Sequence, residues 1–135
     1  KFSTSMGRIR NGENGFEDLK HLPFLSWRDW MYSLNNFKYG IHLMRTHAAG
    51  TFALNCAYLG IPCVGYYGLD SQELCHPDLT VDIGNLKLAK EILLRLQDDI
   101  GFYLECSSSC KENYNKHFHE SSYLLKMNKQ IVSLL

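Results

Sequence analysis

The sequence predicts an α/β fold, in which a Rossmann-like parallel sheet is flanked by helices and followed by a helical C-terminal segment. Short apolar runs at 39–44 and 61–66 have the length of buried strands. A helical pattern over 51–59 lies between them and ends at Gly60, with Pro62 just beyond it. A strand, a helix and a second strand in this order form a βαβ unit, whose two strands we expect to be parallel neighbours.

The remaining elements follow from local signals along the chain. Ser26, with Asp29 three residues later, is typical of a capping box and predicts a helix that runs to about residue 36. A small third strand is expected at 79–81, and a last helical stretch from about 98 to 135, with a break near 107–109. Asn85 is expected to cap a helix over 86–97 whose inward face comprises Leu86, Ala89, Ile92, Leu93 and Leu96.

Composition limits the classes of function. The chain has 135 residues, 45% of them hydrophobic, which is enough for one domain with its own core. Its 14 basic residues balance 14 acidic ones, so we expect no nucleic-acid partner. No apolar run reaches the roughly 20 residues of a transmembrane helix. Five cysteines are an odd number, and Cys56 and Cys63 lie in or beside apolar segments, which predicts reduced thiols and a cytoplasmic location.

Two regions of the chain differ in composition and in apolar periodicity. Residues 1–22 carry three glycines and little apolar periodicity, so we expect an extended arm or the remnant of a preceding strand and loop; residues 23–135 are globular in pattern. The chain begins with Lys1 rather than Met, consistent with a piece of a longer protein. No Gly-Lys-Ser/Thr follows the early glycines and no Gly-x-Ser-x-Gly occurs, which excludes a phosphate-binding P-loop and a hydrolase nucleophile elbow. Arg8 and Arg10 are expected in a solvated arm, the alternative being contact with a phosphate.

The turn between the first strand and the following helix is the candidate site. It reads Thr46-His47-Ala48-Ala49-Gly50-Thr51. In a parallel sheet, ligands bind beyond the carboxyl ends of the strands, where helix amino-termini point at them. Small residues let an anion approach the backbone, and the free amides of the first helical turn hydrogen-bond phosphate oxygens. The alternative is that these small residues serve only to pack the helix on the sheet.

Three segments together resemble the donor-binding signature of GT-B glycosyltransferases: the stretch from His47 to Asn55, the triplet Gly60-Ile61-Pro62, and Asp70-Ser71-Gln72. In the UDP-glycosyltransferase version, a histidine opens the turn and a glutamate follows eight positions later. A Gly-Val-Pro comes five residues after that glutamate, and an acidic-Gln pair ten beyond its proline. A retaining branch has two glutamates spaced eight apart, a spacing that positions 47 and 55 share. The resemblance covers about 22–120 and is strongest over 46–72. Asn55 departs from the family glutamate, and Ser71 from the acid beside the glutamine.

This resemblance implies a role for each matching residue. His47 would be the catalytic residue, stabilising the leaving diphosphate together with the amides of Gly50 and Thr51, with neither a metal nor another cofactor. Asn55 would bind the nucleotide ribose. The rest of the implied donor site consists of Thr46, Ala49, Phe52, Asp70 and Gln72, the last two reaching hydroxyls of the transferred sugar.

The resemblance also implies an enzyme that transfers a sugar from a nucleoside-diphosphate sugar. Residues 23–135 would be the carboxyl-terminal, donor-binding domain, shortened at its N-terminal side and inactive alone. The missing N-terminal Rossmann-like domain would supply the acceptor pocket and, in inverting members, the general base. Two alternatives are a nucleotide-sugar epimerase of the same architecture and a non-catalytic nucleotide-sugar-binding or scaffold domain, the latter favoured by Asn55.

Two further groups of cysteine and histidine residues are candidate sites. Cys106, Cys110 and His117 would share one face of a continuous helix, but no fourth zinc ligand is evident, so we expect ordinary helix residues and no metal. The segment Cys75-His76-Pro77 is expected in a loop beside the donor site, with His76 lining the pocket as the alternative.

Overall fold

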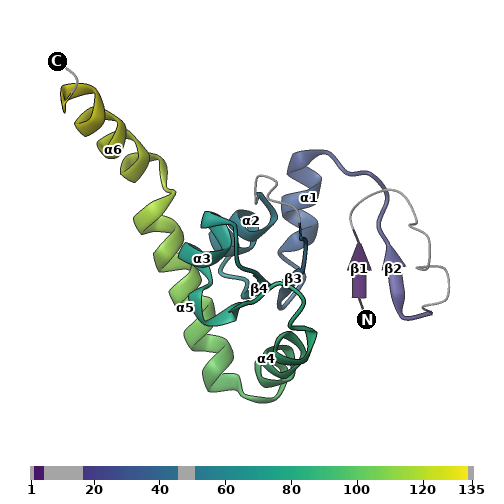
Figure 1. Ribbon diagram of the computed structural model, residues 1–135. Coiled ribbons are helices and arrows are strands. Elements are labelled where there is room, and N and C mark those ends of the chain that lie inside the picture. Colours follow the sequence, from purple (N-terminus) through teal and green to yellow (C-terminus); the bar gives the residue numbers. More distant parts are fainter. Residues whose placement is uncertain (1, 5–16, 46–50, 134–135) are drawn as a thin grey trace. The chain divides into compact units, whose positions relative to one another are not determined.

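A computed structural model describes residues 2–4, 17–45 and 51–133 of the chain (Figure 1). The chain divides into two compact units, residues 1–36 and residues 37–135. Each unit is described by itself.

The described residues of the first unit form two short strands and a helix. Strand β1 (Phe2–Thr4) pairs in parallel with β2 (Leu19–His21), an arrangement inside the segment that the sequence predicts only as an extended arm or remnant. Helix α1 (Trp27–Leu34) begins at the predicted cap, where the Ser26 hydroxyl accepts a hydrogen bond from the Asp29 N–H at 3.2 Å and donates to its carboxylate at 2.6 Å. The capping-box prediction is therefore confirmed.

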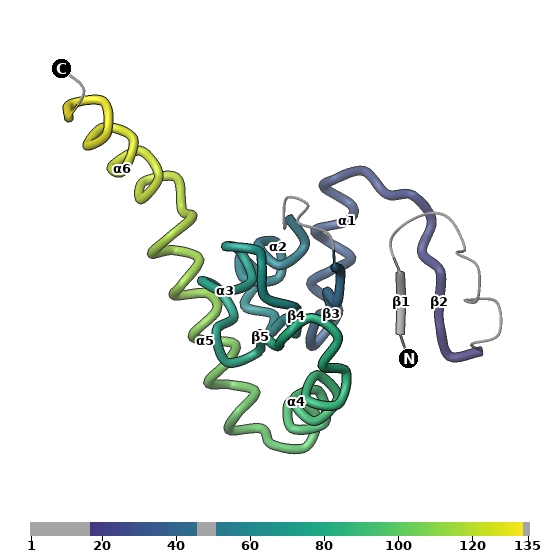
Figure 2. Tube along the Cα trace, in the orientation of Figure 1, coloured from purple at the N-terminus to yellow at the C-terminus, as the bar shows by residue number. Residues whose placement is uncertain are grey.

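The second unit is built on a three-stranded parallel sheet. Strands β3 (Gly40–His42), β4 (Cys63–Tyr66) and β5 (Thr80–Val81) lie in the order β3-β4-β5, and Figure 2 shows them side by side. Helix α2 (Thr51–Leu59) connects β3 to β4. Gly60 follows it with a φ of +71°, a left-handed conformation that ends a helix at little cost in glycine. The predicted α/β class, the βαβ unit and the third strand are all confirmed.

The register of the strands assigns residues to the two faces of the sheet. Gly40 lies opposite Cys63, and Gly65 lies opposite both His42 and Thr80. Because side chains alternate along a strand and paired residues share a face, these five residues lie on one face. That face is covered by α2 and by α3 (Asp70–Cys75), which precedes the short 3-10 helix η2 (Pro77–Leu79).

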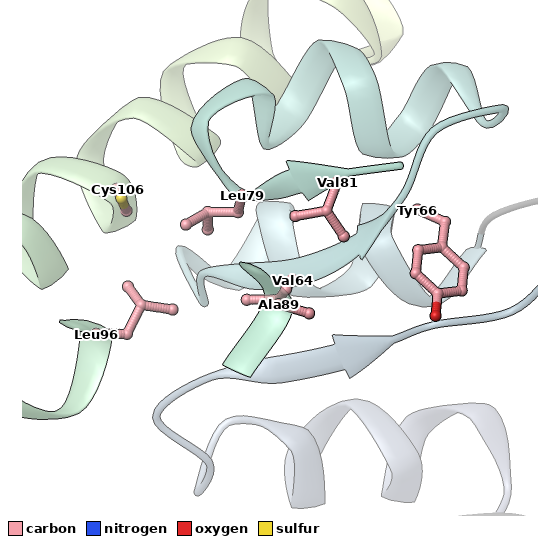
Figure 3. Packing of buried hydrophobic residues seen from close by; sticks show 7 residues of the cluster. All are labelled: Val64, Tyr66, Leu79, Val81, Ala89, Leu96 and Cys106. Atoms are coloured by element: carbon pink, nitrogen blue, oxygen red, sulfur yellow. The ribbon is translucent and has the colours of Figure 1, made fainter. Parts of the chain in front are cut away.

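The opposite face of the sheet carries the main hydrophobic core (Figure 3). Helix α4 (Leu86–Asp98) packs there, and its N-cap is the predicted one, since the Asn85 side chain accepts from the Leu88 N–H at 3.2 Å. Leu86 is 61% exposed, so its predicted inward position is wrong; it opens the helix, and the buried stripe begins one turn later at Ala89. The cluster consists of Val64, Tyr66, Leu79, Val81, Ala89, Leu96 and Cys106.

Two helices complete the second unit, α5 (Ile100–His117) and α6 (Glu120–Ser133). The predicted break near 107–109 is wrong, because α5 is continuous there. The helical conformation is interrupted at 118–119 instead, between α5 and α6. The Ser107 hydroxyl donates to the Gly60 carbonyl at 2.6 Å. The serine that predicted a break therefore anchors α5 to the end of α2. No helix in the described part of the chain is both long and apolar enough to cross a membrane.

Candidate functional site

The candidate site lies at the carboxyl edge of the parallel sheet in the second unit. Strands β3 and β4 both end at this edge, and helices α2 and α3 begin there. Four of the predicted site residues, Thr46, His47, Ala49 and Gly50, lie outside the described residues. The geometry of the site is therefore that of Thr51, Phe52, Asn55, Asp70 and Gln72.

Helix α2 presents two of these side chains on one face. Thr51 is its first residue and is exposed, whereas Asn55 follows four positions later and is half-buried. Residues four apart on a helix are neighbours, so the Thr51 hydroxyl and the Asn55 amide lie on the same side of the helix amino-terminus. The first N–H groups of a helix have no partner within it, and they carry partial positive charge toward a ligand. This end of α2 therefore carries the partial positive charge that favours an anion.

Phe52 joins helix α2 to strand β3. Its ring lies 5.6 Å from that of His42, at an interplanar angle of 52°. It also covers Gly40, where a Cβ atom would stand 3.0 Å from the Phe52 Cε1 atom and 2.9 Å from the Cys56 sulfur. Phe52 thus has a clear packing role beside the donor-site role that the resemblance implies.

The structure separates Asp70 from Gln72. Asp70 is the exposed first residue of α3, whereas Gln72 is 0% exposed, and residues two apart on a helix do not share a face. Of these two residues, only Asp70 presents its side chain to solvent at the edge of the sheet. The contact of Gln72 with a sugar hydroxyl stays a prediction.

Gln72 ties α3 to the sheet. Its side-chain NH2 group donates to the Cys63 carbonyl at 2.8 Å and to the Thr80 hydroxyl at 3.3 Å, so it bridges the beginnings of β4 and β5. The side chain lies directly over Gly65, where a Cβ atom would stand 2.5 Å from Gln72 Cδ. The Gln72 Oε1 atom has no hydrogen-bond partner among the described residues. The buried Gln72 amide therefore has one acceptor atom, Oε1, whose hydrogen bonding the described residues do not satisfy.

His76 is a second interior polar residue and is only 2% exposed. Its Nδ1 atom accepts the Cys63 N–H at 3.4 Å, so the proton is on Nε2, which donates to the Ala53 carbonyl at 3.0 Å. Burial lowers the pKa of His76 to about 4, although the bond to Ala53 opposes that shift. His76 is thus a neutral bridge between α2 and β4. The Cys-His-Pro segment, predicted as a loop, contains the end of α3 and the start of η2.

His42 is a site residue that sequence reasoning missed. It ends β3 on the face covered by α2 and α3, burial lowers its pKa, and its Nδ1 atom has no hydrogen-bond partner in the described part of the chain. The Ser71 hydroxyl and Gln72 Oε1 are the other buried side-chain atoms in this condition. His42 lies at the end of β3, and Ser71 and Gln72 lie in α3, which covers the same face of the sheet. Buried polar atoms of this kind cost free energy unless something satisfies them. A histidine inside an apolar strand was the only signal.

The cysteines of the candidate metal group lie inside the fold. Cys106 and Cys110 are buried, and the Cys110 thiol donates to the Ser107 carbonyl at 3.3 Å. Among residues 2–4, 17–45 and 51–133, no three His, Cys, Asp or Glu side chains gather as a metal ion requires. A comparison with models of known protein families and with curated proteins found no match to this chain.

Proposed function

We propose that the chain is the nucleotide-sugar donor-binding half of a GT-B glycosyltransferase, which transfers a sugar from a nucleoside-diphosphate sugar to an acceptor. The observation that carries the proposal is the β3–α2–β4 unit. The segment that resembles the family signature, 47–55, follows β3 in the sequence and includes the amino-terminus of α2. Polar side chains lie around that end, and the helix dipole favours an anion there.

The proposed chemistry is displacement at the anomeric carbon of the sugar. The bond from this carbon to the diphosphate oxygen breaks as the bond to the acceptor oxygen forms, and the acceptor proton passes to a base of the N-terminal domain. The departing diphosphate gains negative charge, which the amides that open α2, together with His47, would stabilise. Asn55 would bind the ribose, and the exposed carboxylate of Asp70 would accept from a sugar hydroxyl. None of these steps calls for a metal ion or another cofactor.

The alternative with a specific observation behind it is a non-catalytic nucleotide-sugar-binding domain. Asn55 stands where the family has a glutamate, and an amide binds ribose hydroxyls less strongly than a carboxylate does. Asn55→Glu separates the two proposals. If Asn55 has weakened the site, the glutamate variant should bind the nucleotide more tightly than the wild type does. We also propose a cytoplasmic location, because the five cysteines are free thiols inside the fold.

The proposal is tested by amide NMR of the 135-residue chain titrated with UDP, GDP and ADP. We expect saturable shifts at Thr51 to Asn55 and at Asp70 with one of the three nucleotides. His47→Ala should weaken that binding at least tenfold, whereas Ser109→Ala, in helix α5, should leave it unchanged. Shifts confined to other parts of the chain, or equal binding by both variants, would contradict the proposal.

A further inference from the structure

A second concave site lies at the opposite edge of the sheet from the proposed donor site. It is a groove of about 490 Å3 between η2, α4 and α5. Asp78, on its wall, precedes β5, so the groove lies toward the amino ends of the strands, whereas α2 begins at their carboxyl ends. Its volume lies within the range of sites for small molecules or single side chains.

The floor of the groove is apolar. Ile92 of α4 and Phe102 of α5 are half-buried, and both pack against the main hydrophobic core. Cys106, which is 5% exposed, also lines the groove. Burial, and to a lesser extent the carboxylates of Asp78 and Glu105, raise the pKa of the Cys106 thiol to about 11, although Arg95 opposes the shift. The floor therefore carries no charge at neutral pH and suits a hydrocarbon chain.

The rim of the groove is acidic on three sides. Asp78 comes from η2, Glu91 from α4 and Glu105 from α5, and all three are exposed. None of them forms an ion pair with another described residue. Three carboxylates that come from three elements of one groove, and outnumber its single cation Arg95, raise the local concentration of cations.

One cation is already held on this wall. The Arg95 guanidinium lies 3.9 Å from the centroid of the Phe102 ring, in cation–π geometry, and its Nε is 3.6 Å from the Asp99 carboxylate. The wall thus binds a guanidinium of its own chain by an aromatic face and a carboxylate. The groove thus carries the three carboxylates of the rim against the single guanidinium of Arg95, whose charge is shared with Asp99.

We propose that this groove binds an organic cation with an apolar body, namely an alkylammonium or alkylguanidinium group. The cationic head lies between Asp78, Glu91 and Glu105, and the hydrocarbon lies on Ile92 and Phe102. Such a group is supplied either by a free amine or by a lysine or arginine side chain of a partner protein. This inference does not depend on the glycosyltransferase proposal.

The test is amide NMR of the whole chain with three probes of one shape: hexylamine, hexanol and hexanoate. We expect only hexylamine to shift the amides of Ile92, Phe102 and Glu105 in a saturable way. A fourth probe, the peptide acetyl-Leu-Lys-Leu-amide, distinguishes the two sources. At least tenfold tighter binding of the peptide than of hexylamine assigns the groove to a partner's side chain, and the reverse order assigns it to a free amine.

Two variants move the affinity in opposite directions. Glu105→Gln removes one rim charge and should weaken hexylamine binding about two- to fivefold, the usual effect of one exposed charge pair. Arg95→Gln frees the Phe102 ring and the Asp99 carboxylate, so it should strengthen binding. Glu112→Gln, further along α5, is the matched control and should change nothing. Equal shifts with hexanol, or equal affinity in the Glu105 and Arg95 variants, would overturn the proposal.

Discussion

Protonation of His76 should destabilise the fold as the pH falls. In the folded chain the imidazole accepts the Cys63 N–H and donates to the Ala53 carbonyl, a pair of roles that only the neutral ring can fill. Burial lowers its pKa to about 4, against an ordinary value of 6.5. The unfolded chain therefore binds a proton at a higher pH than the folded chain does, and acid favours unfolding.

The size of the effect follows from this difference. Each unit of pKa shift corresponds to about 1.4 kcal/mol, so the full loss is about 3 kcal/mol once the pH is below 4. The stabilisation is complete above the unfolded pKa and declines as the pH falls from 6.5 toward 4. Between pH 7 and pH 5 the free energy of unfolding should fall by about 2 kcal/mol through His76 alone.

The assay is urea unfolding followed by helical circular dichroism at pH 7 and pH 5. His76→Gln cannot titrate, so its loss between the two pH values should be about 2 kcal/mol smaller than that of the wild type. Ser109→Ala, which removes no titratable group, is the control and should keep the wild-type loss. If the glutamine variant does not fold, an NMR titration of the wild-type His76 ring replaces it. A ring pKa near 6.5, or equal losses in wild type and His76→Gln, would refute this reasoning.

Three further predictions concern packing in the second unit. Gly65→Ala should lower the free energy of unfolding by about 1–3 kcal/mol, because the new methyl group displaces Gln72 from the Cys63 carbonyl; an unchanged urea midpoint would count against it. Ser107→Ala should cost about 1 kcal/mol, since the Gly60 carbonyl loses its donor, and Ser109→Ala, measured beside it, should cost less. A colorimetric thiol reagent at pH 7 should react only as fast as the chain unfolds, because burial raises the pKa of Cys75, Cys106 and Cys110, and a hydrogen bond with Cys56, together with burial, raises that of Cys63. A rapid burst from the folded protein would contradict this.

Elements with local signals were predictable from the sequence. The Ser26–Asp29 box and the Asn85 cap act over three residues, and both helices begin where these side chains accept their hydrogen bonds. Gly60 ends α2 because its positive φ is a local property of glycine. The parallel pairing of β3 with β4 followed from the helix between them, since such connections place the second strand beside the first.

The errors arose where distant residues decide the outcome. Ser107 lies inside a continuous helix because its hydroxyl reaches Gly60, 47 positions earlier in the chain. The three-residue strands β1 and β2 are too short for any periodicity to show. Local patterns report the residues within a few positions, so they predict neither contact.

The candidate site was predictable only in part, for the same reason. The positions of Thr51 and Asn55 on the first turns of α2 follow from the helix period. The burial of Gln72 and His76 depends on Cys63, Ala53 and Thr80, which come from other elements. A glutamine near an aspartate suggests a paired surface site, whereas the fold turns the glutamine inward.

The central claim is that the amino-terminal end of α2 recognises a diphosphate, and calorimetry of the whole chain tests it most directly. UDP, GDP and ADP would each be titrated beside the corresponding nucleoside. We predict that one diphosphate binds at least tenfold more tightly than its nucleoside, and that this advantage decreases with added salt. Equal affinity for a nucleotide and its nucleoside, or heat from none of the three diphosphates, would contradict the claim.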